Sequence, residues 1–393
     1  MIIRKTYKYR IYPSKSQITN LENQFSMCRH LYNWSLAERI DAYKNNGETV
    51  TYNQQQNNLP KLKINRPWYK GVYSQVLQDV LKRLDKAYQS FFRRVKNNET
   101  PGFPKFKKRG QWNSITYTQY NNKPDSYIKV PKLGMVKMVL HRTVPKDAKV
   151  KTLNIIKEGN KWFACFLVEE KCLQKQYPHK LKPALLPVGI DLGLIDLYYT
   201  SDGQFSPTPK YYRKKQKHLS RLQRKLAKAV KGTFKWKKLL RAVQKTHYRI
   251  KCMRKDFLHK QANSLLNKSS LIICEDLKIS NMNRRPKPKQ DENGEYLPNG
   301  ASWKLGLNKS IADTGWRMFL DFIGYKAFWQ QKNIISVAPQ FTSQICPDCG
   351  VKVKKSLSTR THICECGCRM HRDHVAALNI LRIGLNTLAV TPA

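Results

Sequence analysis

The chain opens on an alternating pattern of apolar and mostly basic residues. Between residues 3 and 11 this period of two predicts a strand with one buried and one solvent-facing side. Ser14 and Gln17 then have the spacing of a helix N-terminal capping box. From Leu21 to Leu36 apolar residues recur every three or four positions, which predicts an amphipathic helix with its stripe in the core.

A second amphipathic helix is predicted after a polar loop. Its apolar stripe runs from Leu77 to Phe91. The opposite face is polar and basic, and a solvated surface is the simplest interpretation of it. That face carries Gln75, Gln78, Lys82, Arg83 and Lys86.

Short β-rich segments with turn residues between them follow the second helix. Their composition and alternation predict strands. With the N-terminal strand they predict a small β-barrel into which the helices are inserted. The predicted strands are 115–117, 127–130, 136–140, 152–156 and 162–168.

Three acidic residues stand within or beside apolar segments. Asp191 lies in the run 187–194, Glu275 lies near the end of the run 271–277, and Asp373 opens a helical pattern. A carboxylate in an apolar strand must be paired, hydrogen-bonded or bound to a cation. Asp191 taken alone fits an aspartate that caps a turn equally well. Three converging carboxylates, however, suit two divalent ions about 3.5–4 Å apart that hydrolyse a phosphodiester. This is the layout of an RNase H-like, RuvC-type nuclease.

Half of the ten cysteines crowd into residues 346–368, whereas the others are dispersed like reduced core residues. Cys346 and Cys349 lie on one turn and Cys364 and Cys366 on another, and each turn ends in cysteine followed by glycine. Four thiolates on two turns satisfy tetrahedral zinc and leave no coordination position for catalysis, so a structural zinc site is predicted. The alternative ligands are Cys368, His362 and His371.

The charge balance of the chain indicates what kind of partner it binds. Lys and Arg number 74 against 26 Asp and Glu, a net charge of +48. Such an excess predicts a polyanionic partner, and the accompanying aromatic residues favour nucleic acid over a membrane surface. Residues 203–255 contain 19 Lys and Arg in 53 positions and no acid. Their periodicity predicts two basic helices, joined near Gly232, that contact phosphates.

The ordered combination of motifs resembles the TnpB family, which comprises transposon-encoded, RNA-guided DNA endonucleases related to type V CRISPR effectors. The resemblance covers nearly the whole chain. Two positions depart from the family pattern: His371 stands where the family often has aspartate, and Val375 where it often has asparagine. The motifs are Gly189-Ile190-Asp191-Leu192-Gly193, Glu275-Asp276-Leu277, Thr342-Ser343-Gln344, Cys346-Pro347-Asp348-Cys349-Gly350, and Arg372-Asp373 with Ala376-Ala377 and Asn379-Ile380-Leu381.

The resemblance implies a multidomain α+β fold. The implied domains are a wedge-like β-barrel (1–14 and 112–187), a helical recognition lobe (15–111), a RuvC-like α/β nuclease (188–340 and 369–393) and an inserted zinc ribbon (341–368). It also implies that Mg2+ or Mn2+ binds Asp191, Glu275 and Asp373, while Zn2+ binds the cysteines. Gln75, Gln78 and Lys82 become candidates for reading a short DNA motif beside the target.

The implied function is cleavage of double-stranded DNA next to that motif through a single metal-dependent RuvC-like site, directed by a guide RNA encoded near the transposon end. Asp196 and Asp276 are predicted to lie off the metal face. Without a signal core or an apolar run of about 18 residues, the protein is expected inside the cell with no membrane partner. The resemblance further implies a monomer that acts on nucleoid DNA in the cytoplasm of a prokaryote. The alternative is a guide-directed DNA-binding regulator or transposition accessory protein without cleavage. Retention of all three acids favours the nuclease.

Overall fold

A computed structural model describes residues 2–171, 185–356 and 358–390. They form two compact units, Met1–Gln174 and Lys175–Ala393, each of which is described by itself. Cys172 and most of the predicted linker from Gln174 to Pro187 lie outside the described residues.

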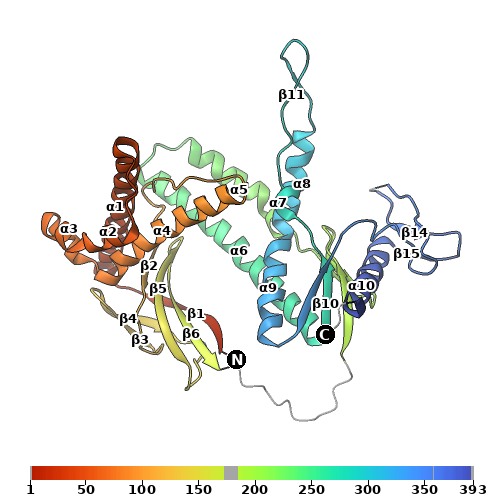
Figure 1. Ribbon diagram of the computed structural model, residues 1–393, viewed down its shortest axis with the longest axis horizontal. Helices are drawn as coiled ribbons and strands as arrows, with labels where there is room; N and C mark the ends of the chain where they lie inside the picture. Colours follow the sequence, from red (N-terminus) through yellow and green to blue (C-terminus); the bar gives the residue numbers. More distant parts are fainter. Residues whose placement is uncertain (1, 172–184, 357, 391–393) are drawn as a thin grey trace. The chain divides into compact units, whose positions relative to one another are not determined.

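The N-terminal unit is built on a six-stranded antiparallel sheet of order β2-β5-β6-β1-β4-β3 (Figure 1). The first strand of the chain, β1 (Ile2–Tyr12), pairs with β6 on one side and β4 on the other. The edge strands β2 and β3 have four residues each, and the sheet stays open as a half-barrel where the sequence predicted a barrel. The other strands are β2 (Ser114–Tyr117), β3 (Tyr127–Val130), β4 (Gly134–Val139), β5 (Lys149–Glu158) and β6 (Lys161–Lys171).

Two long helices cover this sheet. The predicted capping box starts α1 (Lys15–Asn46): the Gln17 backbone N–H donates to the Ser14 hydroxyl and the Ser14 N–H to the Gln17 side chain. The apolar stripes of α1 and α4 (Ser74–Lys96) share one hydrophobic core with the strands, so the segments predicted as wedge and helical lobe pack around a common core. Shorter elements between the two helices are α2 (Tyr52–Asn57), α3 (Leu59–Asn65) and a 3-10 helix (Pro67–Gly71).

The C-terminal unit contains a five-stranded sheet of order β13-β10-β7-β8-β9. The neighbours β7, β10 and β13 are parallel, whereas β8 and β9 continue from β7 as antiparallel strands. The strands are β7 (Leu186–Asp191), β8 (Asp196–Thr200), β9 (Phe205–Pro207), β10 (Ser269–Glu275) and β13 (Asn333–Val337).

Helices cover both faces of this sheet, and β10 lies between α9 (Trp316–Trp329) and α10 (Arg372–Val390) in Figure 1. Close packing of α10 depends on two glycines. A Cβ on Gly189 of β7 would lie 2.3 Å from the Ala377 carbonyl oxygen, and one on Gly384 of α10 would lie 2.4 Å from Ile273 of β10. The opposite face packs on α9 and α6 (Phe234–Lys268).

The remaining elements are attached around this layered body. The predicted pair of basic helices is present as α5 (Tyr211–Ala227) and α6, and Gly232 between them has a positive φ of 93°. No helix in the described part of the chain is long and apolar enough to cross a membrane. The other elements are α7 (Ile279–Met282), β11 (Lys289–Gln290), β12 (Tyr296–Leu297), α8 (Ala301–Thr314), β14 (Thr361–Ile363) and β15 (Arg369–His371).

Candidate active site and metal centre

The two strand acids stand at the same end of neighbouring parallel strands. Asp191 is the last residue of β7 and Glu275 the last residue of β10. Gly189 and Ile273 face α10, and side chains two residues apart in a strand project from the same face. Asp191 and Glu275 therefore point to the α10 side of the sheet.

Asp373 comes to this place because it lies in the first turn of α10. The buried Asn379 of α10 fixes the adjoining loop, since its amide donates to the carbonyl oxygens of Thr342 at 2.8 Å and Ile345 at 2.7 Å. The Thr342 hydroxyl in turn donates to Glu275 at 2.6 Å. Helix, loop and strand thus hold Asp373 and Glu275 in one constellation.

Asp191 lies close enough to the other two acids for their charges to affect its protonation. Burial and the charges of Glu275 and Asp373 raise the pKa of Asp191 to about 8, against a lowering effect of Arg372. Burial also raises the pKa of Glu275, although the Thr342 hydrogen bond opposes the shift. In the described part of the chain, only ribbon side chains form a group of three or more ligands with all ligand atoms within 4.8 Å, so at least one pair of the three carboxylates is farther apart than that. Partly desolvated acids of like charge fit a site for hard divalent cations.

The two acids predicted to lie off the metal face, Asp196 and Asp276, differ in their surroundings. Asp276 is exposed, as expected of a residue off the metal face. Burial and the charge of Asp373 raise the pKa of Asp196, so Asp196 belongs to the electrostatic environment of the site. Strand alternation could not reveal this, because Asp373 arrives from a helix almost 180 residues later in the chain.

Two residues from the ribbon side flank Asp373. The Arg360 guanidinium lies 3.9 Å from the Asp373 carboxylate, and His371 Nδ1 lies 4.0 Å from it. The Asp373 backbone N–H also donates to His371 Nδ1 at 3.3 Å. Val375, the second departure from the TnpB pattern, is fully buried.

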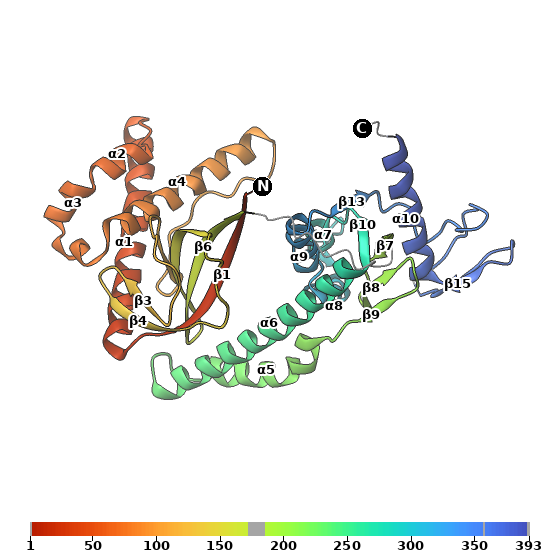
Figure 2. The same ribbon diagram turned by 90° about the horizontal axis from the view of Figure 1, so that it is seen from below.

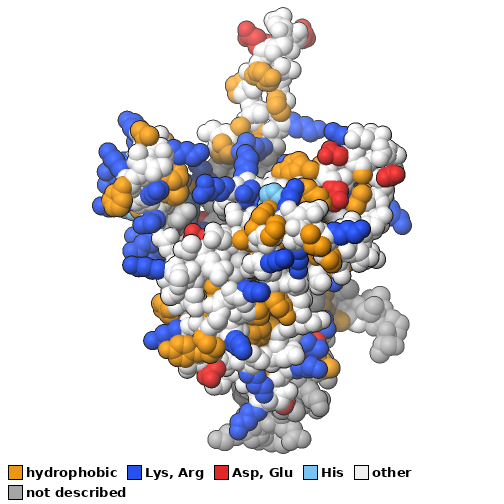
Figure 3. Space-filling model, turned by 90° about the vertical axis from the view of Figure 1, so that its left-hand side faces the viewer, with side chains coloured by type: hydrophobic (Ala, Val, Ile, Leu, Met, Phe, Trp, Pro, Cys, Tyr) orange, Lys and Arg blue, Asp and Glu red, His pale blue; other side chains and the backbone are white. Residues whose placement is uncertain are grey.

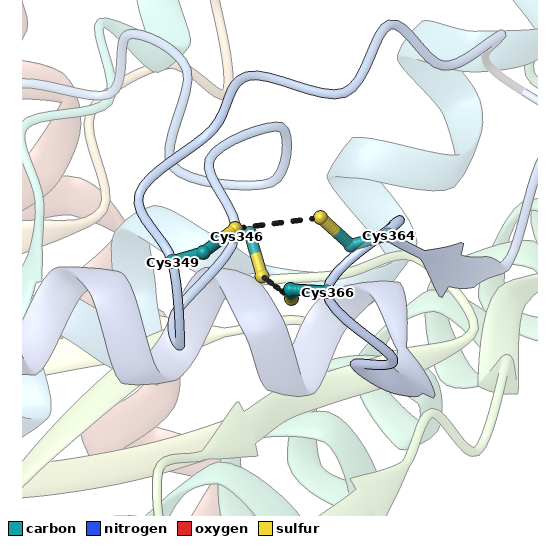
Figure 4. Close-up of side chains that lie close together, drawn as sticks. All are labelled: Cys346, Cys349, Cys364 and Cys366. Carbon is teal, nitrogen blue, oxygen red and sulfur yellow. Dashed lines mark hydrogen bonds between the residues drawn. The ribbon is translucent and has the colours of Figure 1, made fainter.

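The predicted zinc ligands come together in the ribbon (Figure 4). The Sγ atoms of Cys346 and Cys366 are 3.6 Å apart, and those of Cys349 and Cys364 are 3.5 Å apart. Thiolates bound at about 2.3 Å to one tetrahedral zinc would lie about 3.8 Å apart, so the cluster has the size of such a site. Burial would raise the pKa of the Cys346 thiol, but the amides of Cys349 and Asp348 and the His362 and Cys366 side chains bring it down to about 5, which favours the thiolate form.

A second group of ligands shares Cys346 with this cluster. Cys346, His362 and Cys368 are all buried, and their ligand atoms also lie within 4.8 Å of one another. His362 and Cys368 are two of the three alternative zinc ligands considered from the sequence. The third, His371, belongs to neither group.

The helical hairpin of α5 and α6 presents a groove of about 590 Å³ between its helices. Four of the groove's lining residues, Lys225, Lys228, Lys235 and Lys238, are exposed lysines. Figure 3 likewise shows Lys and Arg side chains spread widely over the face that it draws. The groove offers a strongly cationic surface to an anionic polymer.

A buried carboxylate holds this hairpin in place. Asp313 of α8 accepts the backbone N–H groups of Tyr212 and Arg213, at 2.9 and 3.0 Å, in the first turn of α5. The Arg254 guanidinium of α6 donates to the same carboxylate at 3.0 Å. Asp313 thus joins three helices, and no motif in the sequence pointed to it.

Replacing Asp313 by alanine is expected to lower the free energy of unfolding by about 2–4 kcal/mol, because it uncaps α5 and leaves Arg254 without its acid. Chemical denaturation measures this loss, and hydrogen exchange should localise it to the first turn of α5. Asp321→Ala is the matched control: its pair with Arg317 is exposed, so it should cost less than about 0.5 kcal/mol. Equal effects of the two variants would contradict the role of Asp313.

The predicted DNA-motif readers lie along α4. Lys82 is exposed and Gln78 half-buried, while the Gln75 amide donates to the Gln119 side chain at 2.7 Å. Arg83, placed on the same outer face from the sequence, instead bridges to β2: its guanidinium donates to Ser114 and Thr116 and pairs with Asp79. Only the structure reveals this attachment.

Comparisons with known proteins place these features in one family. Family profiles match residues 167–285 ("Probable transposase"), 316–380 ("Cas12f1-like, TNB domain") and 1–48 ("Helix-turn-helix domain"). The chain is 31% identical over 391 residues to "Putative RNA-guided DNA endonuclease InsQ" of Escherichia coli (strain K12), a match that spans 98% of this chain and 93% of that protein. The chain belongs to the TnpB family.

Other relatives agree with membership of the TnpB family. A Streptomyces pristinaespiralis protein named "Putative RNA-guided DNA endonuclease" is 28% identical, with 98% of this chain and 90% of that protein covered. Among solved structures, a Cas12f1-sgRNA-target DNA complex contains a chain that aligns with a TM-score of 0.55 and 13% identity, covering 97% of this chain and 99% of that chain. This likeness shows a shared fold. The helix-turn-helix profile matches residues 1–48, and within this range the described residues contain β1 and α1.

Proposed function

We propose that this protein is an RNA-guided endonuclease that cleaves double-stranded DNA beside a short motif, through one RuvC-like site formed by Asp191, Glu275 and Asp373. The observation that carries the proposal is the convergence of these acids from two parallel strand ends and a helix start on one face of a sheet. The strands β7, β8 and β9 pair antiparallel, whereas β10 and β13 run parallel to β7. This arrangement supports an RNase H-like nuclease domain.

The three carboxylates would hold Mg2+ or Mn2+, hard cations that prefer oxygen ligands. When bound, divalent ions there would supply water activation and charge stabilisation at the leaving oxygen. The chain's own contribution is to hold the acids: Thr342 orients Glu275, Asn379 anchors the Thr342 loop to α10, and Arg360 lies beside Asp373.

Guide RNA and target DNA are the proposed partners. The +48 charge and the lysine-lined groove between α5 and α6 supply phosphate contacts, and Gln75, Gln78 and Lys82 are proposed to read the motif beside the target. Guide pairing would supply the sequence specificity. The relatives named as RNA-guided endonucleases support this assignment.

The test begins with the RNA that copurifies with the protein. Sequencing should return one abundant scaffold with a variable guide segment. The ribonucleoprotein, given Mg2+ and a plasmid library with a guide-matched target beside randomised flanks, should linearise plasmids that share one flank motif. Guide-dependent binding without strand cleavage would favour the regulator alternative instead.

The ribbon is proposed to bind one structural zinc through Cys346, Cys349, Cys364 and Cys366. Cys366→Ser should lose zinc and destabilise the ribbon, because three thiolates do not close the tetrahedral site, whereas Cys368→Ser should keep about one zinc per chain. Metal analysis of the purified variants measures both. Cys346→Ser removes a ligand common to both groups and should lose zinc in either case. Zinc loss in Cys368→Ser with retention in Cys366→Ser would assign the metal to the group with His362.

A further inference from the structure

A row of side chains crosses the sheet from its edge to the candidate site. Tyr199 of β8 is the register partner of Asp191 on β7 and of Phe205 on β9. Directly opposed residues of antiparallel strands project from the same face. Phe205, Tyr199 and Asp191 therefore stand side by side on the α10 face, with Phe205 on the edge strand.

The Tyr199 ring is nearly parallel to two neighbouring rings, those of Phe205 and His371. The Tyr199 ring lies 5.5 Å from the Phe205 ring at 17° and 5.2 Å from the His371 ring at 15°. His374 lies 5.6 Å from Tyr199 at 33°, and its Nε2 is 3.1 Å from the Ser201 carbonyl oxygen. The stacked rings thus join the sheet edge to the segment that carries Asp373, and β8, β9, β15 and the start of α10 lie together in Figure 2.

The outer rings are open to solvent. The Phe205 side chain is 55% exposed although it stacks on Tyr199, and His371 is also exposed. Cations accompany the rings: Arg360 lies 3.9 Å from Asp373, and the charges of Arg360 and Lys210 oppose the rise in the pKa of Asp196 that burial and the charge of Asp373 cause. Exposed rings beside cations and the three acids form a surface suited to bases with their phosphates.

We propose that Phe205, Tyr199 and His371 form a stacking platform for an unpaired base of single-stranded DNA, next to the phosphate presented to the three acids. The proposal rests on the proposed nuclease function, which makes DNA the strand at this site. A single strand is required because a base inside a duplex has both faces covered by its neighbours, whereas an unpaired base can stack on an aromatic ring without regard to sequence.

The position of the platform defines its task. Adjacent strands lie about 4.8 Å apart, so Phe205, two strands from Asp191, is about 10 Å away along the row. A base stacked on Phe205 would belong to a nucleotide neighbouring the scissile phosphate. Stacking it would fix the strand in register with the carboxylates, which makes Phe205 a positioning residue.

The experiment uses the full-length ribonucleoprotein with its copurifying RNA, in buffer without Mg2+ or Mn2+ so that no strand is cut. The probe is a 12-nucleotide oligothymidine strand that carries one 2-aminopurine, whose fluorescence is quenched on stacking. Phe205→Leu should weaken binding by about 5- to 100-fold and remove the quench, the range for loss of one base–aromatic stack. Phe205→Trp should restore both. Tyr296→Leu, which removes another exposed aromatic ring on β12, should match the wild type.

The outcomes separate the platform from the nuclease. If the wild type cleaves its target and Phe205→Leu binds and quenches like the wild type, the platform is refuted and the nuclease stands. If the wild type fails to cleave but Phe205→Leu still loses the quench, the platform stands and the nuclease fails. A Phe205-dependent quench with the matching RNA strand, and none with DNA, would overturn the assignment to DNA.

Discussion

Asp191→Ala is expected to abolish cleavage of a guide-matched plasmid, by at least about 10³-fold, while leaving guide-dependent DNA binding within about threefold of the wild type. The loss removes one of three carboxylates that would hold the divalent ions, and residues that act as a unit lose nearly all activity when one is removed. Binding rests on base pairing and on basic surfaces elsewhere. Plasmid cleavage in Mg2+ and a gel shift at fixed salt, with the same target, measure the two effects.

The companion variants make this result specific. Glu275→Ala and Asp373→Ala should lose activity similarly, and a double variant should be little worse than either single one. Asp276→Ala is the control, because Asp276 is an exposed acid directly after Glu275 and should retain activity. Asp196 does not serve as a second control, since the charge of Asp373 reaches it. Robust cutting by Asp191→Ala, or loss of binding together with cutting, would overturn the site assignment.

Misfolding is separated from lost chemistry by the isosteric Asp191→Asn variant. In the folded chain, burial and two neighbouring acids raise the pKa of Asp191 to about 8, so near neutral pH its ionisation opposes folding in the absence of metal. Removing the acid should therefore leave the melting temperature, measured without Mg2+ or Mn2+, equal to or above that of the wild type. An inactive variant with this melting behaviour has lost chemistry and kept its fold.

Features encoded locally could be predicted from the sequence. The capping box at Ser14 needs only residues three apart, and the two basic helices follow from a run of 53 residues in which apolar positions keep helical spacing. The apolar runs that form β7 and β10 were also visible in the sequence, each with its acid, although only the structure shows that the strands end at Asp191 and Glu275. The convergence of the acids was a hypothesis that the resemblance to TnpB made specific.

Features that depend on distant partners could not be read in this way. In the sequence Asp313 cannot be distinguished from other helix aspartates, because its contact with the first turn of α5 depends on how α8 packs. Arg83 lies on the solvent side of a helical projection, but in the structure its guanidinium donates to Ser114 of β2. The common core of the first unit has the same origin, since β1 pairs with β6, which begins at Lys161. Helical periodicity indicates which side of a helix is buried but does not identify the element that covers it.

The four groove lysines are expected to govern the salt dependence of RNA binding. Because neutralising phosphates releases counterions, log K should fall linearly with log salt, by about 0.7–0.9 per phosphate contact. Replacing Lys225, Lys228, Lys235 and Lys238 together by alanine should reduce that slope by about three and weaken binding most at low salt. Filter binding of the copurifying RNA between about 50 and 200 mM salt measures the slope; the wild type should lose about 10³-fold or more in affinity over this range.

The control removes cations that already have acidic partners. Lys260 pairs with Asp256 at 2.8 Å and Arg317 with Asp321 at 3.0 Å, so the double variant Lys260→Ala and Arg317→Ala should leave the slope almost unchanged. If both variants lower the slope in proportion to the charge removed, RNA binding depends on net charge alone. The groove lysines would then contribute no more than other surface cations. A fall confined to the groove variant would assign phosphate contacts to the α5–α6 hairpin, because there lysines from two helices face one groove in a segment without acids.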